Sequence, residues 1–158
     1  MMLIIEALTT ELAVRTTTIQ AVAAIEAVIQ PHDVWTYQAL TDLLAQNSMK
    51  LMTATHSIND DILGYCLYQV VFEQAEILRI GTHPKYQRQG IASQLFVTLN
   101  EELQACEVDS LLLEVRADNA PAIALYEQQE FTIIHRRKGY YQLPHQPAID
   151  ALIMQREF

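Results

Sequence analysis

Glycine, proline and cysteine are all scarce in this sequence. Its 158 residues include four Gly, five Pro and two Cys, whereas hydrophobic residues make up 51%, and this combination excludes a disordered or fibrous chain. The sequence shows no evident apolar stretch of membrane-spanning length, and residues 1–14 lack the basic region that opens a signal peptide. We therefore expect one globular domain over residues 1–158, located in the cytoplasm and away from membranes.

The cysteines and histidines are scattered singly along the chain. Cys66 and Cys106 each lie in an apolar context without a second cysteine or a histidine at ligand spacing, so we interpret both as small core residues. The five histidines do not cluster either. The sequence therefore predicts no metal site.

Basic residues are also few. Ten Lys and Arg stand against 19 Asp and Glu, which gives a formal net charge of -9. Nonspecific nucleic-acid binding needs a broad basic surface, so we expect no direct contact with nucleic acid. A cation or a basic peptide is the more natural partner.

The order of the expected elements indicates a mixed α/β fold. Helical periodicity predicts helices at residues 16–29, 36–46, 91–106 and about 119–129, the first with a threonine cap and ending before Pro31. Strands are expected at residues 3–9, 50–57, 62–74, 76–83, 110–117, 131–141 and 148–158. The three strands within residues 50–83 should form an antiparallel meander. The apolar run 110–117 is typical of a strand buried on both faces, and it should follow a right-handed crossover.

Small and basic residues gather where the strand 76–83 gives way to the next helix. In "HPKYQRQGIASQLF", residues 83–96, Gly90 and Ala92 stand at the helix start, and Lys85 and Arg88 add positive charge. A helix start presents unpaired N–H groups and the positive end of the helix dipole, which suits phosphate. Neither the nucleotide P-loop pattern nor the dinucleotide pattern occurs. The stretch predicts a pyrophosphate held mostly by backbone, with a glycine that merely serves the turn as the alternative.

Four stretches together resemble one enzyme family: "VVFEQAEILRIGTHPKYQRQGIASQLF", "LLLEVRADNAPAIALYEQQEF", "HRRKGYY" and "DALIM". They are similar to the GNAT acyltransferases, and within them to the bacterial ribosomal-protein-alanine N-acetyltransferases (RimI-like enzymes), over about residues 60–158. The resemblance implies a central mixed, mostly antiparallel sheet of six or seven strands. It also implies a splayed parallel pair of strands and helices on both faces.

The resemblance further implies acetyl-CoA as the co-substrate. Its pyrophosphate would lie over residues Arg88, Gln89, Gly90, Ile91, Ala92 and Ser93, its pantetheine arm along Ile80, Gly81 and Thr82, and Asn119 would cap its own helix and contact the coenzyme. Gly81 is expected to mark the bulge that splays the parallel strands, with an amide region suited to polarise the thioester carbonyl. The alternative is a glycine that only ends a strand.

Two residues match the family's acid-base pair. Glu114, the only acidic residue of "LLLEVRA", matches the proton acceptor, and Tyr126 matches the proton donor to the leaving thiolate. From position alone, Glu114 could instead pair with Arg116 or Arg79, and Tyr126 could be a packing residue. An acyl-cysteine route through Cys106 has no nearby histidine in its favour, so direct attack in a ternary complex is expected.

The acceptor implied by the resemblance is the N-terminal alanine amine on the basic end of a small-subunit ribosomal protein, with Tyr140 and Tyr141 as walls of its site. The sequence departs from the family pattern at Ala92, at Thr82 and in the loop "LPHQP" of residues 143–147, which borders the acceptor. We interpret the basic run 136–138 as a solvated strand edge. Two alternatives stay open: a GNAT enzyme for a small amine such as a polyamine or amino sugar, and a coenzyme-A-binding module without turnover.

Overall fold

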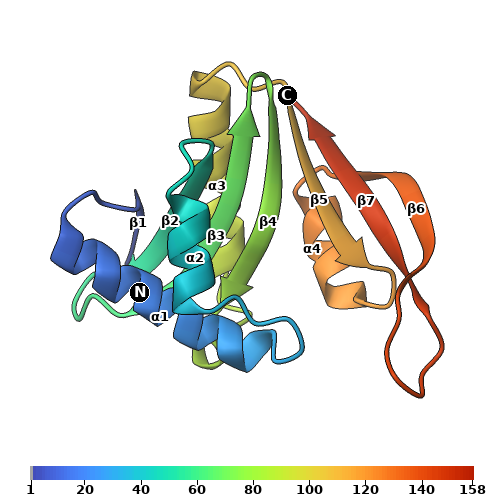
Figure 1. Cartoon of the computed structure of the whole chain (residues 1–158). Coiled ribbons are helices and arrows are strands. Elements are labelled where there is room, and N and C mark those ends of the chain that lie inside the picture. Colours follow the sequence, from blue (N-terminus) through green and yellow to red (C-terminus); the bar gives the residue numbers. More distant parts are fainter. Residues whose placement is uncertain (1) are drawn as a thin grey trace.

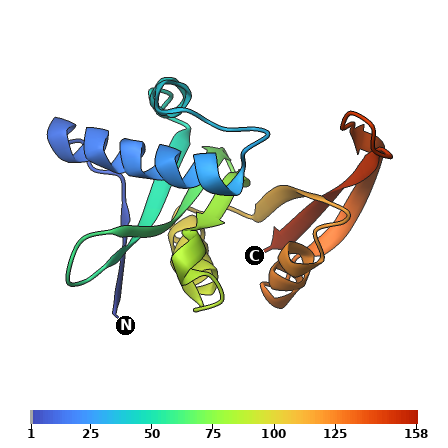
Figure 2. The ribbon, with the colours of Figure 1, turned by 90° about the horizontal axis from the view of Figure 1, so that it is seen from below.

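The computed structural model describes residues 2–158, which form one seven-stranded sheet with two helices on each face (Figures 1 and 2). The strands are β1 (Leu3–Ala7), β2 (Met49–His56), β3 (Ile62–Val71), β4 (Gln74–Thr82), β5 (Ser110–Arg116), β6 (Thr132–Tyr141) and β7 (Ile149–Glu157). The helices are α1 (Leu12–Ile29), α2 (Tyr37–Leu44), α3 (Ile91–Ala105) and α4 (Ala120–Gln128), with a short 3-10 turn, η1, at Pro84–Tyr86. The sheet order is β1-β2-β3-β4-β5-β7-β6, and only the β4–β5 pair is parallel. The predicted fold class is confirmed.

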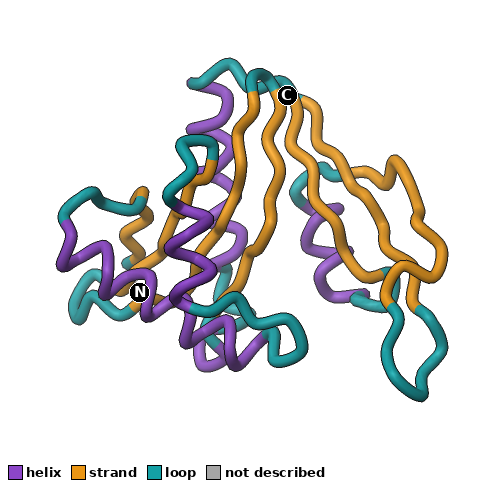
Figure 3. Tube along the Cα trace, in the orientation of Figure 1, coloured by secondary structure: helices purple, strands orange, loops and turns teal. Residues whose placement is uncertain are grey.

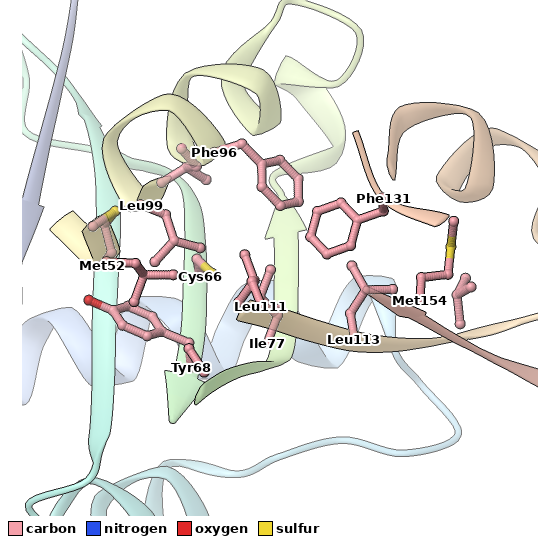
Figure 4. Packing of buried hydrophobic residues seen from close by; sticks show 14 of the residues in the cluster. Met52, Cys66, Tyr68, Ile77, Phe96, Leu99, Leu111, Leu113, Phe131 and Met154 are labelled. Carbon is pink, nitrogen blue, oxygen red and sulfur yellow. The ribbon is translucent and has the colours of Figure 1, made fainter. Parts of the chain in front are cut away.

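Two apolar clusters hold the helices to the sheet. Helices α1 and α2 cover one face, where Ile19, Val22 and Leu40 pack with Tyr65 and Leu67. Helices α3 and α4 cover the other face, and Figure 4 shows the larger cluster there, in which Phe96 and Leu99 of α3 meet Leu111 and Met154 of the sheet. Because successive side chains of a strand point to opposite faces of the sheet, the sheet contributes buried residues to a core on each face.

Helix α1 begins earlier than the threonine-rich run predicts. The side chain of Glu11, not of a threonine, caps it by accepting a hydrogen bond from the N–H of Val14. The Thr17 hydroxyl donates to the carbonyl of Ala13, one turn back, so its side chain is satisfied inside the helix. The threonine cap is therefore wrong, because a threonine can also be accommodated within a helix by this back-bond.

Helix α1 also overturns the expectation that no segment has membrane-spanning length. Its 18 residues have a mean hydropathy of 1.4, enough by length and composition to cross a membrane. In the fold, however, a stripe that includes Ile19, Val22 and Glu26 is buried against the sheet. A core helix meets the same hydropathy criterion, since it too needs apolar side chains.

The two cysteines have different environments. Cys66 is fully buried, as predicted, and burial raises the pKa of its thiol. Cys106 is exposed, so its interpretation as a core residue is wrong. Helix α3 ends at Ala105, and Cys106 leaves the helical conformation with φ -91° and ψ 10°, which takes it off the apolar stripe.

Strands β4 and β5 pair over only part of their length. Parallel pairs run from Gln74 with Ser110 to Ile77 with Leu113, and the strands then diverge (Figure 1). The register of β4 against β3 shifts at the same point, because Tyr68 pairs with Ile77 and Leu67 with Arg79, which leaves Leu78 as the extra residue of a β-bulge. The splayed pair is therefore present, but its bulge lies at Leu78.

Gly81 has a different structural role from the predicted one. It pairs in register with Tyr65, so it is not the bulge residue. A Cβ on Gly81 would lie 2.5 Å from Ile29 Cδ1 and 2.7 Å from the Tyr65 hydroxyl oxygen. Glycine is required here because the Tyr65 ring and α1 approach the backbone closely.

Candidate active site

The N-termini of α3 and α4 lie at the same edge of the sheet, because each helix follows the carboxyl end of one of the diverging parallel strands (Figure 1). Residues Ile80, Gly81 and Thr82 form the last part of β4, beyond the final β4–β5 pair. Asn119 caps α4, with its side-chain oxygen accepting from the N–H of Ala122 at 3.3 Å. The capping prediction is confirmed, and the fold brings these predicted residues to one edge.

The turn before α3 has the geometry of an anion cradle. Gly90 is the N-cap residue with φ +80°, and Arg88 also has a positive φ, +62°. The first hydrogen bond of the helix runs from the N–H of Gln94 to the carbonyl of Gly90. The backbone N–H groups of Ile91, Ala92 and Ser93 therefore precede the helical ladder and are free of it, as at any helix start. Left-handed residues beside such a helix start form a concave array of N–H groups that fits a phosphate.

Glu114 lies at the start of the gap, one residue beyond the last parallel pair of β5. Its neighbours Leu113 and Val115 are buried with α3, so the Glu114 side chain points to the α1 and α2 face of the sheet. Its Oε2 accepts a hydrogen bond from the Tyr141 hydroxyl at 2.9 Å, and Arg137 Nη1 lies 3.7 Å from its Oε1. About a quarter of the side chain, 27%, remains exposed. Strand β5 is thus buried fully on only one face, and the prediction of burial on both faces is wrong.

The partners of Glu114 differ from those considered from the sequence. Arg116 forms a two-bonded pair with Asp118, at 3.1 and 3.0 Å, and Arg79 binds groups of the α1 side. Arg137 comes instead from β6, which lies beyond β7 in the sheet order. The prediction of β6 as a strand edge is confirmed, but Arg137 also reaches Glu114, and Arg136 pairs with Asp150 at 2.8 Å. Register across two strands, not local sequence, brings Arg137 there.

Tyr126 lies on the opposite face of the sheet from Glu114. It packs edge-on against Phe96, with ring centroids 6.1 Å apart, and against Phe131 at 6.0 Å. Burial, the largest cause, raises the pKa of Tyr126 to about 12. The phenol therefore keeps its proton throughout the neutral pH range, which is the form that a proton donor needs.

The two tyrosines predicted as acceptor walls form one aromatic pair. The rings of Tyr140 and Tyr141 meet edge to face at 5.2 Å, and the Arg137 guanidinium carbon lies 5.3 Å from the Tyr140 ring centre. Burial and the hydrogen bond to Glu114 raise the pKa of Tyr141. Beyond them, residues 142–148 form a loop that extends past the sheet (Figure 3). Tyr141 therefore touches the carboxylate as well as forming part of the predicted wall.

Within residues 2–158, no group of three or more His, Cys, Asp or Glu side chains is arranged to hold a metal ion. Polar side chains near the gap include the Glu114 carboxylate, the Tyr141 phenol and the Arg137 guanidinium, and the Tyr126 phenol lies on the opposite face. Such a set can move protons and stabilise charge. It meets the needs of acyl transfer to an amine, which requires a proton acceptor for the attacking amine and a proton donor for the leaving group.

The comparisons with known proteins agree with this chemistry. The family described as "Acetyltransferase (GNAT) family" matches residues 17–131. The "[Ribosomal protein bS18]-alanine N-acetyltransferase" of Haemophilus ducreyi is 32% identical over 112 residues, which cover 71% of this chain and 77% of that protein. The protein of the same name from Escherichia coli strain K12 is 42% identical over 83 residues, 52% of this chain and 56% of that protein. The latter match therefore spans about half of the relative's length.

The fold comparison extends over nearly the whole chain. The crystal structure of the ribosomal-protein-S18-alanine N-acetyltransferase from Escherichia coli superposes with a TM-score of 0.83 at 32% identity. The superposition covers 99% of this chain and 94% of that one. Fold and sequence similarity thus point to the same group of proteins.

Proposed function

The chain belongs to the GNAT family of acetyl-CoA-dependent N-acetyltransferases, and we propose that it acetylates the N-terminal alanine of a basic ribosomal protein of the bS18 type. The observation that carries this proposal is the similarity to bS18-alanine N-acetyltransferases over 71% of the chain in sequence and 99% in fold. Ribosomal proteins are made in the cytoplasm, and the proposed location of this enzyme is there. We propose no direct contact of this enzyme with nucleic acid or with a membrane.

The co-substrate acetyl-CoA supplies an activated acetyl thioester. Residues Arg88 to Ser93 bind its pyrophosphate, a role supported by the positive φ of Arg88 and Gly90 and by the free N–H groups of the α3 start. Residues Ile80 to Thr82 line the pantetheine arm, which is consistent with the lack of ladder partners across the gap at this end of β4. The side-chain oxygen of Asn119 caps α4, and its side-chain NH2 group is left to donate a hydrogen bond to the coenzyme.

Glu114 and Tyr126 move the protons of the transfer. A peptide α-amino group has a pKa of about 7.7 to 8.0, so Glu114, directly or through water, accepts the proton that makes the amine nucleophilic. Tyr126 gives its proton to the departing sulfur on the other side of the sheet. The support for this division is the placement of the two side chains on opposite faces of the sheet, with Glu114 where β4 and β5 separate and Tyr126 packed against the α3 cluster.

Attack takes place directly in a ternary complex. Cys106 follows the last residue of α3, a helix of 15 residues, and so lies about 22 Å along the helix axis from the anion cradle. An acyl group bound at the cradle end does not reach this thiol without leaving its site. The covalent route through Cys106 therefore has no geometric support.

The acceptor peptide is proposed to enter from the face of Glu114, between the aromatic pair Tyr140 and Tyr141 and the α1 side of the gap. Arg137 and Arg116 stand beside this entrance, but each is already matched by a carboxylate, Glu114 or Asp118. The net charge of -9 then attracts a basic peptide at longer range.

The cradle assignment predicts that Gly90→Glu abolishes the rise in melting temperature that acetyl-CoA gives the wild type. A side chain at Gly90 must adopt a left-handed backbone, and its carboxylate would stand against the pyrophosphate. Gln104→Glu is the matched control, because it adds the same charge to the exposed far end of α3. Thermal shift with and without acetyl-CoA measures both. An unaltered ligand response in Gly90→Glu would reject the cradle.

The proposed acceptor is tested with a panel of acetyl acceptors. A peptide that begins with Ala and continues with basic residues should be acetylated at least about tenfold faster than the same peptide with N-terminal Lys, because the tyrosine walls suit a small side chain and penalise a buried ammonium. Raised salt should weaken the preference for basic tails, since exposed charges are screened over about 8 Å at physiological ionic strength.

The same panel separates the alternatives. If spermidine or an aminoglycoside is a better acceptor than every alanine-starting peptide, the small-amine function replaces the proposed one. If acetyl-CoA binds but no acceptor is modified, the chain is a coenzyme-binding module.

A further inference from the structure

A buried carboxylate lies beside the gap, apart from the groups assigned above. Glu26 of α1 is 1% exposed and accepts a hydrogen bond from the equally buried Tyr65 hydroxyl of β3. Arg79 Nε of β4 lies 3.4 Å from Glu26 Oε2. Burial raises the pKa of Tyr65 and so keeps its hydroxyl protonated as a donor. Burying such charges costs solvation free energy that three apolar side chains would not cost, so stability alone does not account for the cluster.

The outer end of the same guanidinium holds the segment between α1 and α2, residues 30–36. Arg79 Nη2 contacts the Asp33 carboxylate and also donates to the Asp33 carbonyl oxygen at 3.1 Å. Its central carbon lies 4.5 Å from the ring centre of Trp35. One side chain thus joins α1, β4 and the 30–36 segment, with its Nε beside the Glu26 carboxylate. Planar, stacked and multiply bonded contacts of this kind are specific to arginine.

The location of Arg79 links this cluster to the candidate active site. Arg79 immediately precedes Ile80, Gly81 and Thr82, and Tyr65 packs against the Cα of Gly81. Arg79 contacts α1, and so it lies on the face of the sheet to which Glu114 points. Figures 1 and 2 both show the 30–36 segment beside the diverging ends of β4 and β5. The segment therefore stands across the gap from the tyrosine pair.

We propose that Arg79 is a positioning residue that fixes the 30–36 segment as the second wall of the acceptor site, with Glu26 and Tyr65 holding the guanidinium in place. This inference rests on the proposed acetyltransferase function. It assigns to the buried cluster a role in acceptor binding, separate from proton transfer and from coenzyme binding. Loosening the segment should weaken peptide binding and leave the chemical step unchanged.

The sharpest test is Asp33→Asn, because it weakens the outer contact and leaves the buried Glu26 pair intact. We expect the KM for the alanine-starting peptide to rise about fivefold or more, with kcat and the Kd of acetyl-CoA within about twofold of wild type. The matched control is Glu130→Gln. The two ion pairs are alike in exposure: the Glu130 side chain is 75% exposed and that of Asp33 is 72% exposed, and each pairs with an arginine, Arg156 or Arg79, whose side chain is 18% exposed. The control should change none of these values.

A second measurement reads the segment without any turnover. Trp35 is the single tryptophan of the chain, so its fluorescence reports on the 30–36 segment alone. Acrylamide should quench Trp35 more strongly in Asp33→Asn, and more strongly still in Arg79→Lys, which keeps a cation for Glu26 but loses the stacked fork. Arg79→Lys should raise the peptide KM in the same way.

The outcomes separate the two proposals. If the wild type acetylates the peptide and Asp33→Asn behaves like Glu130→Gln in peptide KM and in Trp35 quenching, the positioning role is overturned. A fall in kcat at unchanged KM would also overturn it. If the wild type acetylates no peptide, the proposed function fails. Trp35 quenching that is unchanged in both Asp33→Asn and Arg79→Lys would overturn the positioning role of Arg79 whether or not the peptide is acetylated.

Discussion

Glu114→Gln is expected to lower turnover by about 100-fold at mildly acidic pH, where the acceptor amine is protonated and needs a base. The loss should shrink as the pH rises past the amine pKa, about 7.7 to 8.0, because the amine then loses its proton unaided. The glutamine carbonyl can still accept the hydrogen bond from Tyr141, now made to Glu114 at 2.9 Å, so the site keeps its shape. The measurement is kcat and kcat/KM for an alanine-starting peptide as a function of pH.

Glu76→Gln is the control for this result. Glu76 is exposed on β4, where it pairs with Leu112 at the closed end of the parallel pair, so its substitution removes the same charge from the same sheet away from the gap. It should keep the wild-type profile. A Glu114→Gln enzyme with wild-type turnover across the pH range would remove Glu114 from the proton path.

The sequence predicts those parts of the fold that local interactions decide. Helix α4 is foreseen from Asn119 and Pro121, and the structure has the Asn119 cap with Pro121 in the first turn. The turn at Gly90, where we propose the cradle, follows from a glycine at a strand-to-helix junction, and the φ of +80° at Gly90 is the physical reason for that residue. Hairpins and helix stripes are likewise determined by neighbours in sequence.

Features that depend on register between distant strands are not predictable in this way. The bulge at Leu78 exists only in the pairing of β4 with β3, and the sequence offers Gly81 as a more conspicuous but incorrect marker. Glu26 lies on helix α1, whereas its partners Tyr65 and Arg79 lie on strands β3 and β4, so neither the ion pair nor the contact of Arg79 with Asp33 could be predicted. Arg137 meets Glu114 for the same reason.

Tyr126→Phe is expected to lower kcat by about 100-fold while the Kd of acetyl-CoA stays within about twofold, because the ring packing is kept and only the proton donor is lost. The aromatic contacts with Phe96 and Phe131 need no hydroxyl. Since burial raises the pKa of Tyr126 to about 12, the phenol is protonated at any neutral pH. The loss should therefore be the same factor from about pH 6 to about pH 9, in contrast to the pH-dependent loss in Glu114→Gln.

Tyr68→Phe provides the matched control, because Tyr68 is a buried phenol of the same apolar cluster on β3 and also has a raised pKa through burial. It should keep wild-type kcat, which would show that losing a buried hydroxyl from this core is not itself the cause. A thiol has a pKa near 8.5, so its thiolate can leave without being protonated, and some residual turnover is expected in Tyr126→Phe. Full turnover in that variant, or a loss that follows the pH as in Glu114→Gln, would assign the proton to another donor.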